Sequence, residues 1–330
     1  MLLLETGQQT SADATGAFSL TGVPLAIGAN TFTVRATDVA GNQRSAIQTI
    51  TRTATQVNNA PTDIIFSVEP PPSGTTPPVI VAHLAAVDAD AGDSATFSIA
   101  AQSVLSGAAD TFTINGNALV DGINPHGASI DSYDITVRAT DTHGATYDEH
   151  VVLTFGTNTT SPGDAITGAT GNDIIYALGN GSAFGQHDII HAGSGDDVVF
   201  GQDGRDDLFG EDGNDVLNGG AGGDSLTGGA GSDIFQFSAV ADSTISAPDF
   251  IRDFTHGVDL IDVSAIHGVG DVPLTFDAVA NADVVPNHIT WLEVGASTII
   301  QIDVNGDPFA DMHIVLTGTG LSLDAQDFKV

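Results

Sequence analysis

The sequence predicts an all-β protein in which tandem β-sandwich modules are followed by a parallel β-roll and a β-rich C-terminal cap. Three observations support this prediction. Apolar and polar residues alternate in strings such as "NTFTVRATD", which is the period of a half-buried strand. An aspartate recurs every nine residues from position 188 to position 233. No stretch of more than ten residues shows sustained helical periodicity.

Changes in sequence texture predict two sandwich segments at residues 1–57 and 58–157, a linker at 158–162, the roll at 163–237 and the cap at 238–330. The two sandwich segments share the strings "FTVRATDVAGN" and "ITVRATDTHG", so we expect related modules with the same turn. The first segment resembles the second half of a bacterial immunoglobulin-like repeat. Because such a sandwich has about 100 residues, we expect its first strands to be missing and the chain to be the tail of a longer protein.

The charge balance narrows the function classes. The chain has 42 acidic and seven basic residues, a net charge of −35 and no cysteine. This excess of negative charge argues against binding to nucleic acid or to anionic membranes, and it favours divalent cations as partners. The opening "MLLLE" lacks the features of a signal peptide, and no apolar run reaches transmembrane length. We therefore expect export without an N-terminal signal peptide and no membrane insertion.

The nine-residue repeat carries the candidate metal ligands. Its aspartates, including one earlier copy, are Asp173, Asp188, Asp197, Asp206, Asp215, Asp224 and Asp233. An apolar residue follows two positions after each of the six regularly spaced aspartates. Glycine stands two positions before five of them, at Gly195, Gly204, Gly213, Gly222 and Gly231. The alternative is a disordered acidic linker, but the fixed apolar position argues against it.

Each nonapeptide is predicted to form a tight turn and one short strand, with two nonapeptides in each coil of the roll. Residues eighteen apart then stack, so that Asp197 lies above Asp215 and Asp206 above Asp224. Stacked carboxylates repel one another. A hard cation between successive coils removes that repulsion, and carboxylate and carbonyl oxygens are its preferred ligands.

This pattern resembles the RTX family, whose repeat is G-G-x-G-x-D-x-U-x. The resemblance implies a calcium β-roll with calcium at the seven aspartates named above. The tail, which ends in "LSLDAQDFKV", resembles the C-terminal domain that follows RTX repeats in type I secretion substrates. That resemblance implies a cap on the roll, an export signal at the extreme C-terminus, the type I secretion machinery as a partner, and a bacterial protein located outside the cell or on its surface.

The strings "NNAPTDI", "VDADAGD" and "YDITVRATD" of the second sandwich segment resemble a cadherin-like module. The resemblance implies further calcium at one end of this module, bound by Asn59, Asp88, Asp90 and Asp141. Ordinary turn aspartates are the alternative, because Asx residues favour turns.

An acidic string near the C-terminus matches part of the EF-hand pattern. Asp303, Asn305, Asp307 and Asp311 fall at loop positions 1, 3, 5 and 9. Gly306 stands at position 4 instead of 6. A plain hairpin turn is therefore the favoured interpretation.

No catalytic motif is present: the chain contains no H-E-x-x-H, no G-x-S-x-G and no phosphate-binding glycine loop. We therefore expect a non-catalytic region. The favoured function is the C-terminal part of an adhesin that recognises an unknown surface or host ligand. The alternatives are the secretion tail of a larger enzyme or toxin, or a surface-layer protein.

Overall fold

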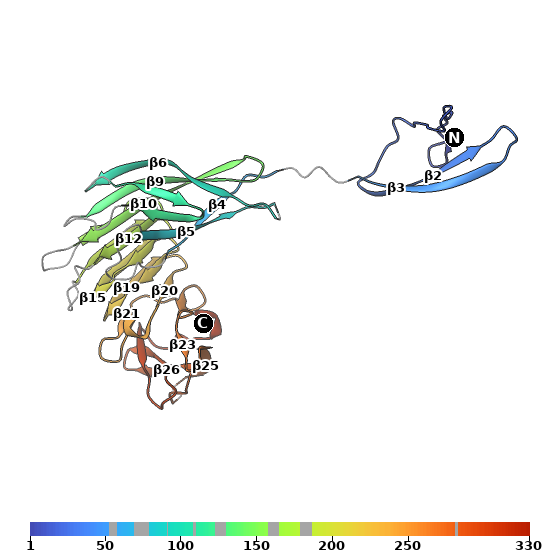
Figure 1. Ribbon diagram of the computed structural model, residues 1–330. Helices are drawn as coiled ribbons and strands as arrows, with labels where there is room; N and C mark the ends of the chain where they lie inside the picture. Colours follow the sequence, from blue (N-terminus) through green and yellow to red (C-terminus); the bar gives the residue numbers. More distant parts are fainter. Residues whose placement is uncertain are drawn as a thin grey trace. The chain divides into compact units, whose positions relative to one another are not determined.

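The computed structural model describes residues 1–52, 58–68, 79–90, 92–107, 110–122, 130–157, 165–178, 187–280 and 283–330. Within them every regular element is a strand except two 3₁₀ helices, η1 (Val240–Asp242) and η2 (Ala325–Asp327), so the all-β prediction is confirmed. The predicted linker at 158–162 lies outside the described residues. The chain forms two compact units, Met1–Asn58 and Asn59–Val330 (Figure 1). No helix among the described residues could span a bilayer.

The N-terminal unit is an antiparallel sheet of β1 (Leu2–Leu3), β2 (Gly28–Thr37) and β3 (Gln43–Arg52), in that order. Asp38 closes the β2–β3 turn, because its Oδ1 accepts the backbone N–H of Ala40 and of Asn42, both at 2.9 Å. Phe32 and Val34 help to line an open apolar cavity of about 760 Å³. Within residues 1–52 there is no second sheet to cover it.

The second unit begins with a sandwich. One sheet has the order β4 (Asp63–Ser67), β5 (Val79–Val87), β8 (Ala118–Asp121), β7 (Phe112–Asn115). The facing strands are β6 (Thr96–Ser106), β9 (Asp131–Thr140) and β10 (Thr146–Thr157). Alternate residues of β9 are buried, as the sequence pattern predicts. Tyr133 and Ile135 of β9 pack with Leu119 of β8 in one core.

The β2–β3 and β9–β10 hairpins have the same register. Val34 lies opposite Ala46 in the first hairpin, and Val137 lies opposite Glu149 in the second. Their turns also match: Asp141 Oδ1 accepts two backbone N–H groups at 2.8 Å, as Asp38 does in the N-terminal unit. The shared string "TVRATD" therefore forms the same local structure twice.

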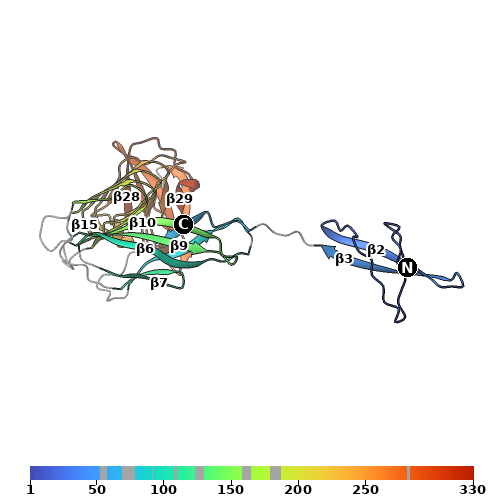
Figure 2. The same cartoon turned by 90° about the horizontal axis from the view of Figure 1, so that it is seen from above.

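The roll consists of two parallel sheets, and the chain passes from one to the other (Figure 2). The parallel strands of one sheet are β11 (Ala165–Thr167), β13 (Ile189–Ser194), β16 (Asp207–Asp212), β19 (Ser225–Ala230) and β21 (Asp249–Ile251). Those of the other are β12 (Asp173–Leu178), β14 (Val198–Phe200), β17 (Val216–Asn218), β20 (Ile234–Gln236), β22 (Leu260–Asp262) and β29 (Phe328–Lys329). A further parallel pair, β15 (Asp203–Gly204) and β18 (Ala221–Gly222), joins two turns.

The sandwich and the roll share a sheet. β10 pairs antiparallel with β9 and parallel with β12, with Val152 opposite Asp173. Aromatic rings continue across the junction, because Tyr176 stacks on Phe155 at 5.4 Å and on Phe200 at 5.2 Å between ring centroids. The Tyr176 hydroxyl donates to the carbonyl of Val81 at 2.9 Å. The two parts are therefore joined by backbone hydrogen bonds as well as by side-chain packing.

A mixed set of strands covers the other end of the roll. β21 pairs in parallel with β28 (Met312–Thr317). β28, β27 (Ser297–Ile302) and β26 (His288–Val294) follow one another in antiparallel pairs, and β25 (Thr275–Ala280) pairs in parallel with β26. A small antiparallel hairpin of β23 (His267–Gly268) and β24 (Val272–Pro273) stands between β22 and β25 in the sequence. Trp291 and Met312 of these strands share one core with Leu226 and Phe235 of the roll.

Candidate metal centre

The repeat aspartates form two columns, one along each edge of the roll. In the first, the backbone N–H of Asp197 donates to Asp215 Oδ1 at 2.9 Å, and that of Asp215 donates to Asp233 Oδ1 at 3.0 Å. In the second, the N–H of Asp188 donates to Asp206 Oδ1, and that of Asp206 donates to Asp224 Oδ1, both at 2.8 Å. The stacking of residues eighteen apart is thus confirmed.

Asp173, the aspartate of the first copy of the repeat, belongs to the first column. Asp173 donates its N–H to Asp197 Oδ1 at 2.8 Å, across 24 residues instead of 18. Residues 179–186, which stand between the two aspartates in the sequence, lie outside the described residues. Asp173 is therefore stacked directly on Asp197, at the end of the first column.

Both columns continue past the regular repeat. Asp224 donates its N–H to Asp249 Oδ1 across 25 residues, and Asp233 donates to Asp259 Oδ1 across 26 residues. The nine-residue spacing does not predict Asp249 and Asp259, because they follow Asp224 and Asp233 by 25 and 26 residues instead of 18. A weaker signal does mark them, because each precedes an apolar residue by two positions, Ile251 and Ile261, as in the repeat.

Glycine is required where successive turns touch. Gly213 has φ of +148°, and a Cβ there would collide with the carbonyl oxygen of Gly195. Gly231 meets Gly213, and Gly222 meets Gly204, in the same way. The five predicted site glycines therefore bring backbone carbonyls of adjacent coils close together, beside the columns.

A second series of glycines, which correspond to the first glycine of the G-G-x-G-x-D-x-U-x repeat but were not among the predicted site residues, leaves room for the carboxylates. A Cβ at Gly201, Gly210, Gly219 or Gly228 would collide with the Oδ2 atom of the aspartate five residues later. These glycines also recur every nine residues, in step with the aspartates. Gln202 directly follows Gly201, and it adopts a positive φ of +71° although it is not a glycine.

The columns hold carboxylates away from water. Asp197, Asp206, Asp215 and Asp224 are fully buried. Their Oδ2 atoms, together with that of Asp249, have no hydrogen-bond partner among the described residues. An ionised oxygen without a partner is costly to bury, so the columns require protonation or a cation.

Burial raises the pKa values of these carboxyl groups. It is the main cause that brings the pKa of Asp215 to about 7, that of Asp197 to about 8 and that of Asp206 to about 9. Burial also raises the pKa of Asp224 and of Asp249, and each is raised further by neighbouring aspartates. Stacked oxygens beside backbone carbonyls are the donor set of a hard cation such as calcium, so the residues present fit such an ion.

The predicted ligands of the second module are brought to one end of the sandwich but are not gathered into one group. Asn59 donates its N–H to Asp90 Oδ2 at 2.6 Å, and Asp90 donates its N–H to Asp88 Oδ1 at 2.8 Å. Asp141 lies instead within 4.8 Å of ligand atoms of Asp93 and His143.

The acidic string near the C-terminus forms the predicted hairpin turn between the antiparallel strands β27 and β28. Asp303 Oδ1 accepts the N–H of Asn305 at 2.9 Å and that of Gly306 at 2.8 Å. Asp311 Oδ2 accepts the N–H of Val304 at 2.8 Å. Asp307 Oδ1 accepts the N–H of a later loop residue. These carboxylates hold the turn closed.

A protein-family model described as Peptidase M10 serralysin C terminal matches residues 136–330, more than half of the chain. The chain belongs to this family. It is an RTX-type family of calcium-binding β-rolls in secreted proteins, in agreement with the RTX resemblance. The match begins within β9, so it includes the β9–β10 hairpin that adjoins the roll.

Metalloprotease AprA of Pseudomonas entomophila (strain L48) is 35% identical over 92 residues, which cover 27% of this chain and 19% of AprA. The chain therefore spans about a fifth of that relative. Of the solved structures, the AlgE6R3 subunit of the Azotobacter vinelandii mannuronan C5-epimerase is 26% identical, with 53% of this chain and 82% of the subunit covered and a TM-score of 0.33. The AlgE6R2 subunit is 23% identical, with 51% and 91% covered and a TM-score of 0.26.

Proposed function

We propose that this chain is the calcium-dependent C-terminal region of a secreted bacterial protein, and that its roll folds when calcium binds outside the cell. The observation that carries the proposal is the pair of columns of buried aspartates, in which the Oδ2 atoms of five members have no hydrogen-bond partner among the described residues: Asp197, Asp206, Asp215, Asp224 and Asp249. Repetition of the arrangement along both edges supports binding of several ions. Asp249 and Asp259 extend the set of ligands beyond the regular repeat.

The affinity range of extracellular calcium modules supports folding after export. Their Kd is about 10⁻⁴–10⁻³ M, far above the free calcium of the cytosol. Without calcium the acidic roll repels itself, so it stays unfolded in the producing cell. Outside, an ion that binds only the folded form stabilises it by mass action.

The C-terminal residues support a defined order of events. β29 pairs with β22, and Lys329 Nζ donates to Asp262 Oδ2 at 2.8 Å. The buried Asp327 accepts the N–H of Gly257 at 3.0 Å. In the folded protein β29 is therefore part of a sheet of the roll, and η2 is held beside it. A type I secretion machinery that reads this tail therefore has to bind it before calcium folds the roll.

For the whole protein we propose an adhesin, with a surface or host ligand that contacts modules upstream of the roll. The two matching hairpins support this role, because repeated sandwich modules serve to extend a protein from a surface. The second candidate is the secretion region of an enzyme, and the similarity to metalloprotease AprA favours it. In either case we propose that the residues of this chain are not catalytic.

The test is secretion of the protein at several external calcium concentrations, for the wild type and for a variant that lacks residues 321–330. We expect calcium to increase the amount of folded secreted protein and the deletion to abolish export. Unchanged export of the deletion variant would refute the signal role of the tail. Secretion and folding that do not respond to calcium would refute the folding mechanism.

A further inference from the structure

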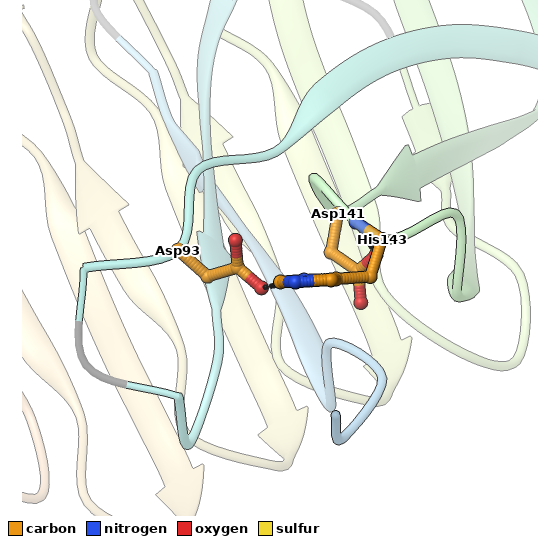
Figure 3. A group of neighbouring side chains, drawn as sticks. All are labelled: Asp93, Asp141 and His143. Carbon is orange, nitrogen blue, oxygen red and sulfur yellow. Dashed lines mark hydrogen bonds and ion pairs between the residues drawn. The ribbon is translucent and has the colours of Figure 1, made fainter. Parts of the chain in front are cut away.

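The sandwich carries a cluster of metal-ligating side chains outside the roll. Asp93 lies in the β5–β6 connection, and Asp141 and His143 lie in the β9–β10 turn (Figure 3). β6 and β9 pair with Thr96 opposite Thr140, which brings the two segments to the same end. One ligand atom from each of the three side chains lies within 4.8 Å of the other two. No other group of three histidine or acidic side chains among the described residues is this close.

The two carboxylates of this cluster are shielded from water. Asp141 is 6% exposed, and the side chain of Asp93 is 7% exposed. The imidazole of His143 is 67% exposed, and its Nδ1 lies 3.3 Å from Asp93 Oδ2. Two carboxylates held together away from water favour a positive charge between them, and the open side beside His143 gives an ion access.

The ligand atoms are held in place by the surrounding turn. Asp141 Oδ1 accepts the N–H of His143 and that of Ala145, both at 2.8 Å. The hydroxyl of Thr142 donates to Asp93 Oδ1. The carboxylate of Asp93 faces the ring of His143, as Figure 3 shows. An ion would therefore meet side chains that are already ordered, which lowers the entropic cost of binding.

The donor set identifies the class of ion. Calcium takes oxygen ligands only, whereas an imidazole nitrogen with carboxylate oxygens suits zinc and related divalent metals. Two donors at about 2.1 Å from a tetrahedral zinc ion are about 3.4 Å apart. The separation between His143 Nδ1 and Asp93 Oδ2 is 3.3 Å. We propose that Asp93, Asp141 and His143 bind a divalent cation of the zinc class, at a site separate from the roll. The bound ion would fasten the β5–β6 connection to the β9–β10 turn.

The test is a calorimetric titration of the full chain with Zn²⁺ in saturating calcium. We expect one site in the wild-type chain. His143→Ala and Asp93→Asn should each weaken it by about tenfold or more, since even indirect support of a metal ligand contributes that much. Asp141 is left intact because its carboxylate also closes the turn. His150→Ala is the matched control: His150 is exposed and paired with Asp134 at 2.7 Å, and its loss should leave the titration unchanged.

Each outcome decides the proposal. Absence of zinc binding in excess calcium would overturn it, because the cluster would then hold no zinc-class ion. Equal zinc affinity in His143→Ala and in the wild type would also overturn it, because the bound ion would lie elsewhere. A calcium titration of the same variants checks their folding. If the roll failed to respond to calcium while the zinc site survived, only the function proposed for the roll would be lost.

Discussion

The sandwich and the roll are joined in one sheet, but their interiors differ. The sandwich has an aromatic core in which Phe112 and Tyr133 lie 5.0 Å apart between ring centroids. The roll has a fully buried apolar residue in each nonapeptide, such as Leu208 or Leu217, and a buried aspartate two residues before it. The sandwich can therefore be stabilised by apolar burial alone. The roll depends on whatever neutralises its aspartates.

The largest effect is expected from removing an apolar residue of the roll. Leu217 lies between Val199 and Phe235 of the two neighbouring parallel strands. Leu217→Ala therefore leaves a cavity and lowers the free energy of unfolding by about 2–5 kcal/mol. We expect the calcium concentration at the folding midpoint, followed by circular dichroism, to rise strongly. Leu119→Ala in the sandwich core is the control and should lower thermal stability with little change in that midpoint. Equal midpoint shifts in the two variants would argue against separate sources of stability.

The next effect concerns position within a column. Asp215 is bonded to Asp197 on one side and to Asp233 on the other, whereas Asp173 bonds to Asp197 at the end of its column. Asp215→Ala should therefore weaken calcium binding more than Asp173→Ala, because it disturbs the spaces on both sides. Calorimetric titration of both variants measures this. Equal losses would contradict the assignment of ions to the spaces between stacked aspartates.

A pH titration should separate the two regions further. Folding raises the pKa of Asp197 to about 8 and that of Asp206 to about 9, from an unfolded value of about 4. The folded, calcium-free roll thus binds more protons than the unfolded chain between these pKa values, so its stability should fall as pH rises from about 4 to about 9. Calcium affinity should rise over the same range. Circular dichroism in chelator that shows no gain of roll structure towards pH 5 would be the contrary result.

The smallest effect is expected at the junction. The buried hydroxyl of Tyr176 donates to Val81 across the shared core. Tyr176→Phe removes one buried hydrogen bond and should cost about 1 kcal/mol, seen as a lower melting temperature in saturating calcium. The calcium midpoint should move by less than in Leu217→Ala. An unchanged melting temperature would mean that this contact does not couple the sandwich to the roll.

The fold class and the aspartate columns could be predicted because both follow from local periodicity. Alternation places Tyr133 and Ile135 on the buried face of β9. The nine-residue step places Asp197 above Asp215. Each inference needs only a short stretch of sequence and a known rise per residue.

The remaining features depend on distant parts of the chain. Asp249 and Asp259 join the columns after coils of 25 and 26 residues, so the fixed step does not reach them. The pairing of β10 with β12 and the approach of Asp93 to His143 depend on tertiary structure, to which no sequence period corresponds. The repeat is therefore a reliable guide within the roll and a poor one at its ends.

Residue-resolved hydrogen exchange of the full chain, with calcium and with excess chelator, tests the central claim most directly. We expect strands β13 to β20 of the roll to be protected only in calcium. Strands β5, β8 and β9 of the sandwich should keep much of their protection in both conditions, because their core contains no aspartate column. Equal protection of the roll strands in chelator would contradict the account.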